Sequence, residues 1–179
     1  MSAAEPFVLL QELDRRCRAG GGAVFAPPEQ KPEWRGVLFR IGQQVLVVAE
    51  SEITEMLTWP ALTRVPWVMP WLRGVANVRG ELLPLVDMSQ YLGGSAIAQS
   101  KQARVLVMRH RLLHAGLLVH EVLGLRRFLE ETFERSIPAE LSPEAGVCVT
   151  GSYAYDGRRY GVFSVQLLAD QPQFLRAAA

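Results

Sequence analysis

Residues 74–86, GVANVRGELLPLV, decide the fold. Two apolar runs, 75–78 and 82–86, flank the tripeptide Arg79-Gly80-Glu81. Runs of β-branched and aliphatic residues favour strands, and a glycine between them supplies the positive φ that a tight turn requires. This stretch therefore predicts a β-hairpin with Gly80 in its turn.

The chain on either side repeats this pattern of short apolar runs separated by turn residues. The most specific turn signal is Asp156-Gly157, because this dipeptide readily adopts the positive φ values of a two-residue hairpin turn. Three further hairpins are predicted: 37–41 with 45–49 across Gly42-Gln43-Gln44, 104–108 with 112–119, and 147–155 with 160–165 across Asp156-Gly157.

The segments between these runs predict connections and helical turns, not long helices. A single helical turn is expected after residue 87, with Asp87 or Ser89 as its cap. Residues 130–146 carry two prolines and are expected to form a long loop with a helical turn. Short strands without long helices between them favour antiparallel β-barrels over a parallel α/β sheet.

The amino-terminal segment has a different periodicity. Phe7, Leu10, Leu13 and Cys17 recur at three- and four-residue spacing, which predicts an amphipathic helix that docks its apolar stripe on a barrel. Glycines and prolines that follow predict a linker. The sequence thus predicts an amino-terminal helix and Gly/Pro-rich linker over 1–33, a main β domain over 34–172 and a carboxyl-terminal tail over 173–179.

Composition narrows the classes of function. The 179 residues include 19 Lys and Arg and 18 Asp and Glu, which gives a net charge of +1. Such a chain has no strong positive electrostatic field to attract phosphate backbones or anionic lipid, so no nucleic-acid partner is expected. No apolar run approaches the roughly 20 residues of a spanning helix, and Glu5 and Glu12 stand where a signal peptide carries positive charge. A cytoplasmic protein without membrane insertion is expected. Cys17 and Cys148 match no metal or disulfide pattern and are expected to be small apolar fillers.

Motifs of catalysis are not found in the sequence, so no catalytic residue, metal or cofactor is expected. His120-Glu121 begins like a zinc-protease motif, but Gly124 stands where the second histidine belongs. Alternation in a hairpin puts His114 and His120 on one face, which keeps open the hypothesis of a small metal-dependent hydrolase. Histidines in half-exposed hairpins are more often ordinary surface groups.

Three tryptophans crowd into the proline-rich segment 59–71: Trp59, Trp67 and Trp71. Its prolines exclude a central strand. Most of the three rings are expected to pack inward, and at least one is a candidate for an exposed anchor, because tryptophan is enriched both in cores and at binding hot spots.

The role of the turn residue Arg79 has two possible interpretations. Its planar guanidinium suits bracing a neighbouring loop or engaging a carboxylate or carbonyl group of a partner protein. Alternatively it is a solvated turn residue beside a glycine that allows the turn.

With these segments identified, the sequence resembles the CheW-like chemotaxis coupling family. Order and spacing of the similar segments both match over about residues 34–170. The segments are 38–42, 52–56, 65–66, 74–80, 83–88 and 116–122. Within the family, the amino-terminal helix and residues 74–80 resemble the branch that serves type IV pili in twitching motility.

The resemblance implies two five-stranded SH3-like barrels packed together in a non-enzymatic adaptor. It implies that one lobe docks the regulatory domain of a CheA-type histidine kinase, and that a groove between the lobes receives the cytoplasmic tip of a methyl-accepting chemoreceptor in an array at the inner membrane. The partner-binding residues that it implies are Ile53, Glu55, Gly74, Asn77, Arg79 and Gly80. An alternative is an SH3-like module that binds a different protein or peptide through the Trp-rich segment.

Overall fold

The computed structural model describes residues 8, 10–11, 14–15, 32–108 and 114–176. The chain divides into two compact units, 1–31 and 32–179. Every described residue of the first unit is helical, in agreement with the predicted amino-terminal helix. Phe7, Leu13 and Cys17 lie outside the described residues, so the docking of this helix stays a prediction.

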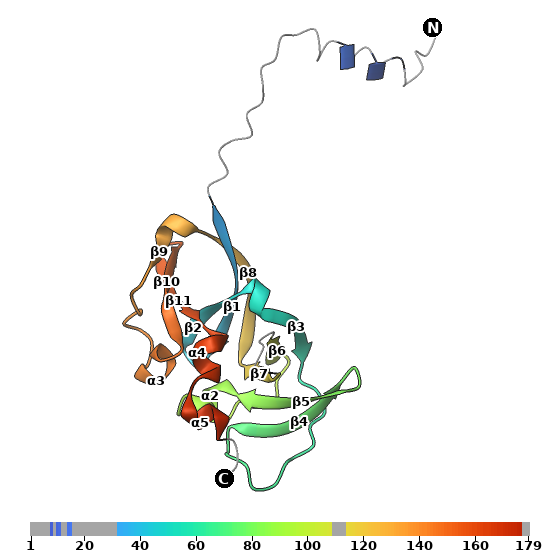
Figure 1. The fold of residues 1–179 in the computed structure, drawn as a ribbon, viewed down its shortest axis with the longest axis vertical. Coiled ribbons are helices and arrows are strands. Elements are labelled where there is room, and N and C mark those ends of the chain that lie inside the picture. Colours follow the sequence, from blue (N-terminus) through green and yellow to red (C-terminus); the bar gives the residue numbers. More distant parts are fainter. Residues whose placement is uncertain (1–7, 9, 12–13, 16–31, 109–113, 177–179) are drawn as a thin grey trace. The chain divides into compact units, whose positions relative to one another are not determined.

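The second unit contains two β-sheets, which confirms the predicted mostly-β fold (Figure 1). One sheet has five strands in the order β3-β6-β7-β5-β4. Its strands are β3 (Ile53–Thr58), β4 (Leu72–Val78), β5 (Glu81–Asp87), β6 (Arg104–Met108) and β7 (Gly116–Val119).

The other sheet has six strands, one more than expected, in the order β8-β1-β2-β11-β10-β9. The additional strand β9 is only two residues long and pairs with β10 beside the predicted hairpin. The strands of this sheet are β1 (Glu33–Ile41), β2 (Gln44–Ala49), β8 (Glu121–Leu129), β9 (Phe133–Glu134), β10 (Val149–Tyr155) and β11 (Arg158–Phe163).

The two sheets are interleaved along the chain. The five-stranded sheet uses the continuous segment 53–119, whereas the six-stranded sheet combines residues 33–49 with residues 121–163. Parallel pairing of β2 with β11 joins its two parts, and β5 pairs in parallel with β7 in the other sheet. Each sheet therefore contains one parallel pair, and its other neighbouring strands pair antiparallel.

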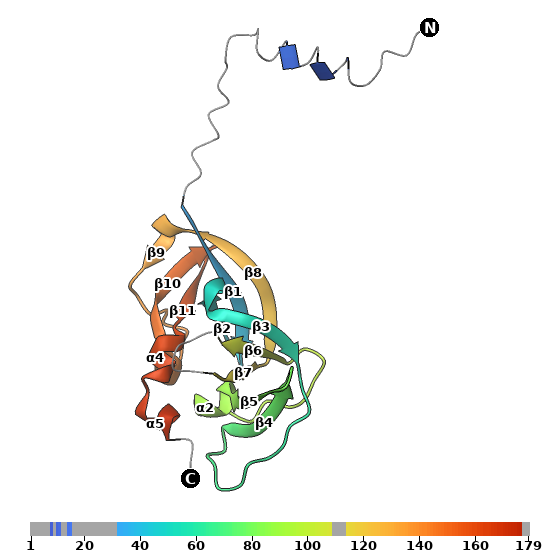
Figure 2. The same cartoon turned by 45° about the vertical axis from the view of Figure 1, so that its right-hand side comes forward.

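Short helices fill the ends of the sheets, and Figures 1 and 2 both show α2, α4 and α5 close together. Phe174 of α5 is buried against Trp71, with ring centroids 5.7 Å apart, so the segment predicted as a tail from residue 173 begins within the packed core. The helices are η1 (Glu50–Glu52), α2 (Met88–Tyr91), η2 (Glu130–Thr132), α3 (Pro143–Gly146), α4 (Val165–Ala169) and α5 (Pro172–Leu175).

Alternate residues of the central strands face different cores. Leu46 of β2 and Leu117 of β7 lie in a core shared by both sheets. Their neighbours Val47 and Leu118 lie in separate clusters, one inside each lobe. Strands buried on both faces lose the alternation of polar and apolar residues, which explains the continuous apolar runs in the sequence. Cys148 belongs to the shared core, as the prediction of an apolar filler requires.

Candidate protein-interaction site

The predicted hairpin at residues 74–86 forms as β4 and β5, paired from Leu72 with Val86 to Val78 with Glu81, with a register shift between Leu72 and Gly74. Arg79 and Gly80 occupy its turn with φ values of 53° and 90°. The Gly80 N–H donates a hydrogen bond to Asn77 Oδ1 over 2.9 Å and fixes the turn. These φ values are easy for glycine but unfavourable for a long side chain such as arginine.

Arg79 joins this turn to strand β3. Its Nη2 donates to Glu55 Oε1 over 2.6 Å, and the Arg79 side chain is 79% exposed while that of Glu55 is 24% exposed. An exposed ion pair of this kind contributes about 0–1 kcal/mol to stability, so most of the guanidinium remains available to other groups. The structure thus places Glu55, Asn77, Arg79 and Gly80 together at one end of the five-stranded lobe.

The two remaining predicted site residues lie elsewhere. Ile53 is partly buried against the shared core. Gly74 is buried at the opposite end of β4, with a φ of 136°, and a Cβ there would lie 2.4 Å from the Thr63 carbonyl oxygen. The close approach arises because Thr63 pairs with Val75 through two backbone hydrogen bonds of 2.9 Å. Gly74 therefore serves the packing of the Trp-rich segment on β4.

A second arginine, Arg73, lies near the opposite end of β4. Its guanidinium carbon lies 5.7 Å from the centroid of the Trp59 ring, and its Nη1 donates to Asp87 Oδ2 over 3.1 Å. Asp87 is fully buried, and its carboxylate also accepts from the backbone N–H groups of Ser89, Gln90 and Ile97. The Asp87 carboxylate thus caps α2, as predicted, and holds Arg73 in position.

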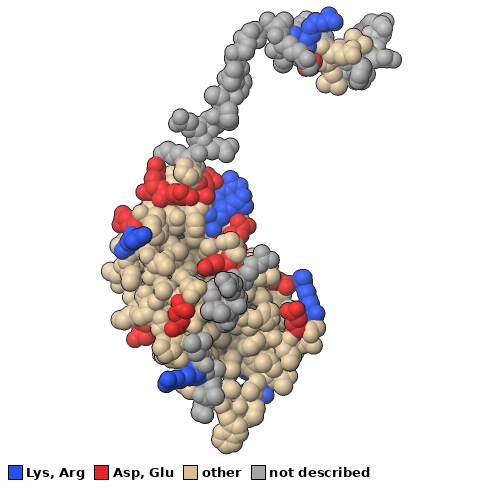
Figure 3. Space-filling view, viewed as in Figure 1, with Lys and Arg blue, Asp and Glu red and all other residues tan. Residues whose placement is uncertain are grey.

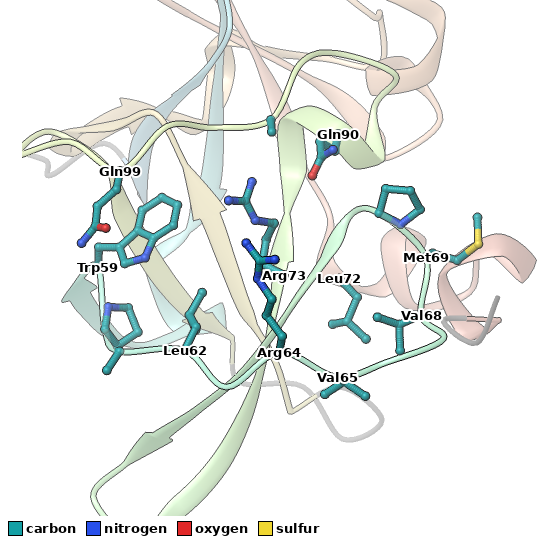
Figure 4. Close-up of a pocket in the computed structure, with 14 residues that line it drawn as sticks. Trp59, Leu62, Arg64, Val65, Val68, Met69, Leu72, Arg73, Gln90 and Gln99 are labelled. Atoms are coloured by element: carbon teal, nitrogen blue, oxygen red, sulfur yellow. The ribbon is translucent and has the colours of Figure 1, made fainter.

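Beside Arg73, the segment between β3 and β4 encloses a groove with a volume of about 860 Å³ (Figure 4). Composition alone signalled this region through its clustered tryptophans, but not the groove or its arginines. The larger apolar side chains that line it are Trp59, Leu62, Val65, Val68, Met69 and Leu72.

The three tryptophans of this segment differ in environment. Trp71 is buried and packs edge to face on Tyr91 with centroids 5.4 Å apart. Trp59 is half-buried on the groove wall. Trp67 is 86% exposed and has a φ of 58°, so it is the exposed ring of the three.

The two described histidines have different partners. His114 Nε2 lies 3.6 Å from Glu81 Oε2, whereas His120 Nδ1 accepts a hydrogen bond from the Gly42 N–H over 3.0 Å. Within the described part of the chain, no group of three or more His, Cys, Asp or Glu side chains is arranged to hold a metal ion. The same residues include no helix long and apolar enough to cross a membrane.

Charge is distributed without a dominant sign. On the face in Figure 3, acidic and basic side chains stand in small groups separated by uncharged surface. The distinctive features of the described residues are an arginine-bearing hairpin and a groove that contains Trp59 and two arginines. Together they define a class, small twin-lobed β-proteins that offer surfaces for contact with other proteins.

The sequence matches the CheW-like domain over residues 35–173, and the chain belongs to this family of scaffold and adaptor proteins. A similar relative, Protein PilI of Pseudomonas aeruginosa, is 38% identical over 176 residues, 97% of this chain and 96% of the relative. Chemotaxis protein CheW of Thermotoga maritima is 29% identical over 126 residues, 70% of this chain and 81% of the relative.

The fold has a counterpart among solved structures. The scaffolding protein TtCheW from Thermoanaerobacter tengcongensis superposes with a TM-score of 0.67 at 19% identity, covering 75% of this chain and 90% of the other. This likeness identifies the two lobes as SH3-like and confirms the predicted fold class.

Proposed function

We propose that this protein is a non-enzymatic adaptor that couples methyl-accepting chemoreceptors to a CheA-type histidine kinase in the array that controls type IV pilus twitching motility. Membership of the CheW-like family supports the adaptor role. Similarity to PilI along nearly the whole chain supports the pilus branch. In this role the paired lobes hold kinase and receptor in one mutual orientation without chemistry of their own.

The observation that carries this proposal is the conformation of Arg79. Its backbone has a positive φ, and the equivalent position in the β10–β11 hairpin is Asp156, a residue that tolerates such a φ better. A conformational cost of about 1 kcal/mol at an exposed turn indicates a function for the side chain beyond the turn. We assign Arg79, with Asn77, Gly80, the neighbouring Glu55 and the partly buried Ile53 on the same strand as Glu55, to contact with the kinase or receptor.

The test replaces Arg79 without disturbing the turn. Asn-Gly is a favoured type I′ turn, so Arg79→Asn should fold at least as stably as the natural chain and yet lower kinase control by about tenfold or more. Kinase autophosphorylation is measured in a reconstituted mixture with purified receptor tips. Asp156→Asn, the matched change in the other hairpin, should leave coupling intact.

Two outcomes would contradict the proposal. Full coupling by Arg79→Asn would remove Arg79 and its neighbours from the interface. Failure of the natural chain to alter kinase activity, or to bind either partner, would overturn the adaptor role itself.

A further inference from the structure

Trp67 is an exposed aromatic ring held on a strained backbone. The side chain is 86% exposed, and its φ of 58° lies in a region that bulky residues rarely adopt. Exposure of a large ring to water and this conformation both cost free energy in the isolated protein. An 86% exposed ring gains little from the described residues around it, so it is available for contact with a partner.

The groove near Trp67 is lined by both apolar and polar side chains and is pre-organised. The Thr63–Val75 pairing fixes the segment on β4, and Asp87 fixes Arg73 against Trp59. A surface that is already ordered loses little conformational entropy when a partner binds. Its volume of about 860 Å³ is sufficient for several side chains of a bound segment.

The charge of the groove is positive. Arg64 and Arg73 both line it, and Figure 4 shows them between Trp59 on one side and Val68 and Met69 on the other. Asp87 compensates the charge of Arg73, whereas Arg64 forms no ion pair with any described residue. None of the described lining residues is Asp or Glu. A carboxylate on a ligand would therefore meet the exposed Arg64 guanidinium, with which it can form charge-assisted hydrogen bonds.

We propose that this groove and Trp67 form a docking surface for a segment of a partner protein that carries an acidic side chain between aliphatic or aromatic ones. The apolar side chains of that segment occupy the groove and contact the adjacent Trp67 ring, and its carboxylate pairs with Arg64. This surface is distinct from the Arg79 turn, because five residues of β4, 74–78, lie between Arg73 and Arg79, which corresponds to about 20 Å of extended chain.

In the experiment, a library of displayed random 12-residue peptides is selected for binding to the immobilised full-length protein. The selected peptides should contain Asp or Glu flanked by apolar residues. A fluorescent synthetic copy of the most enriched peptide is then titrated with the natural chain and its variants. Arg64→Glu should weaken this binding by about tenfold or more, because it replaces attraction with repulsion.

Trp67→Gly separates binding from folding. Glycine adopts a φ of 58° without strain, so this variant should melt no earlier than the natural chain while binding the peptide about tenfold more weakly. Arg135→Glu makes the same charge change at an exposed position outside the groove lining and should leave the affinity within about twofold.

Arg79→Asn is expected to leave peptide binding unchanged, so this test stands independently of the proposed adaptor function. Selection of no peptide, or of peptides without acidic residues, would overturn the proposal. Equal affinity for the natural chain and for Arg64→Glu would do the same.

Discussion

At the scale of the residue, His120 occupies a site that favours its neutral form. Its Nδ1 accepts from the Gly42 N–H, and burial followed by the nearby Arg40 charge lowers the pKa of His120, against a smaller opposite effect of Asp87. In the unfolded chain the pKa is about 6.5, so the folded protein binds fewer protons just below that pH. The free energy of unfolding should therefore decrease as the pH falls through about 6.5.

The variant His120→Asn should lose less stability as the pH falls. The Asn Oδ1 can replace the His Nδ1 as hydrogen-bond acceptor but does not titrate. The measurement compares urea unfolding at pH 7 and pH 5 for the two proteins. An unchanged acid dependence in His120→Asn would show that another group is responsible.

Single residues of the candidate site were predictable in part. The turn at Arg79-Gly80 follows from local chemistry, and the structure has that turn. The pairing of Arg79 with Glu55 did not follow, because no local pattern relates two residues 24 positions apart. Gly74 looked like part of a binding motif, but its positive φ and its contact with Thr63 arise from tertiary packing. The binding roles of these residues stay predictions.

At the scale of the element, α2 and α4 offer a comparison between two caps. Each follows a strand that pairs in parallel with another, but Asp87 caps α2 and Ser164 caps α4. The buried Asp87 carboxylate holds four donors, whereas Ser164 Oγ accepts from the Leu167 N–H. Asp87→Ala should lower the free energy of unfolding by about 3–5 kcal/mol and Ser164→Ala by about 1 kcal/mol, as measured by urea denaturation.

Equal losses in these two variants would mean that water takes over the donors of Asp87. Asp87→Asn helps to separate charge from hydrogen bonding, because the amide retains one acceptor oxygen but not the negative charge beside Arg73. The free energy of unfolding that Asp87→Asn loses is expected to lie between the losses of Asp87→Ala and Ser164→Ala.

Elements were predictable where nearby residues in the sequence determine them, and less so where pairing with distant residues does. All four predicted hairpins are present, because turn residues and apolar runs encode them within about 20 residues. The full extent of β8 was not predicted, since its partner β1 lies more than 80 residues earlier and a bulge at Leu38/Phe39 interrupts the register. The groove escaped prediction although Thr63 pairs with Val75 only 12 positions later, because the proline-rich segment between them carries no strand or hairpin pattern.

At the scale of the whole molecule, the shared core makes the two lobes one cooperative unit. Leu117 of β7 faces this core together with Leu46 of β2, from the other sheet. Leu117→Ala should therefore lower the free energy of unfolding by about 2–5 kcal/mol in both sheets. Native-state hydrogen exchange of the β2 and β7 amides measures this, and both strands should lose protection equally.

Loss of protection in β7 alone would contradict this expectation and show two lobes that unfold separately. Leu82→Ala is a suitable control, because that leucine lies on β5 with its side chain 68% exposed, and it should change exchange in neither strand appreciably.

The interleaving of the two sheets has a consequence for synthesis on the ribosome. Residues 53–119 supply every strand of the five-stranded sheet, so that lobe is complete while the rest of the chain is still being translated. The hairpin of β1 and β2 leaves the exit tunnel first, yet its partners β8 and β11 end only at residues 129 and 163. During this interval the apolar faces of the earliest hairpin are without their final neighbours, and nascent chains in that state are the natural clients of chaperones.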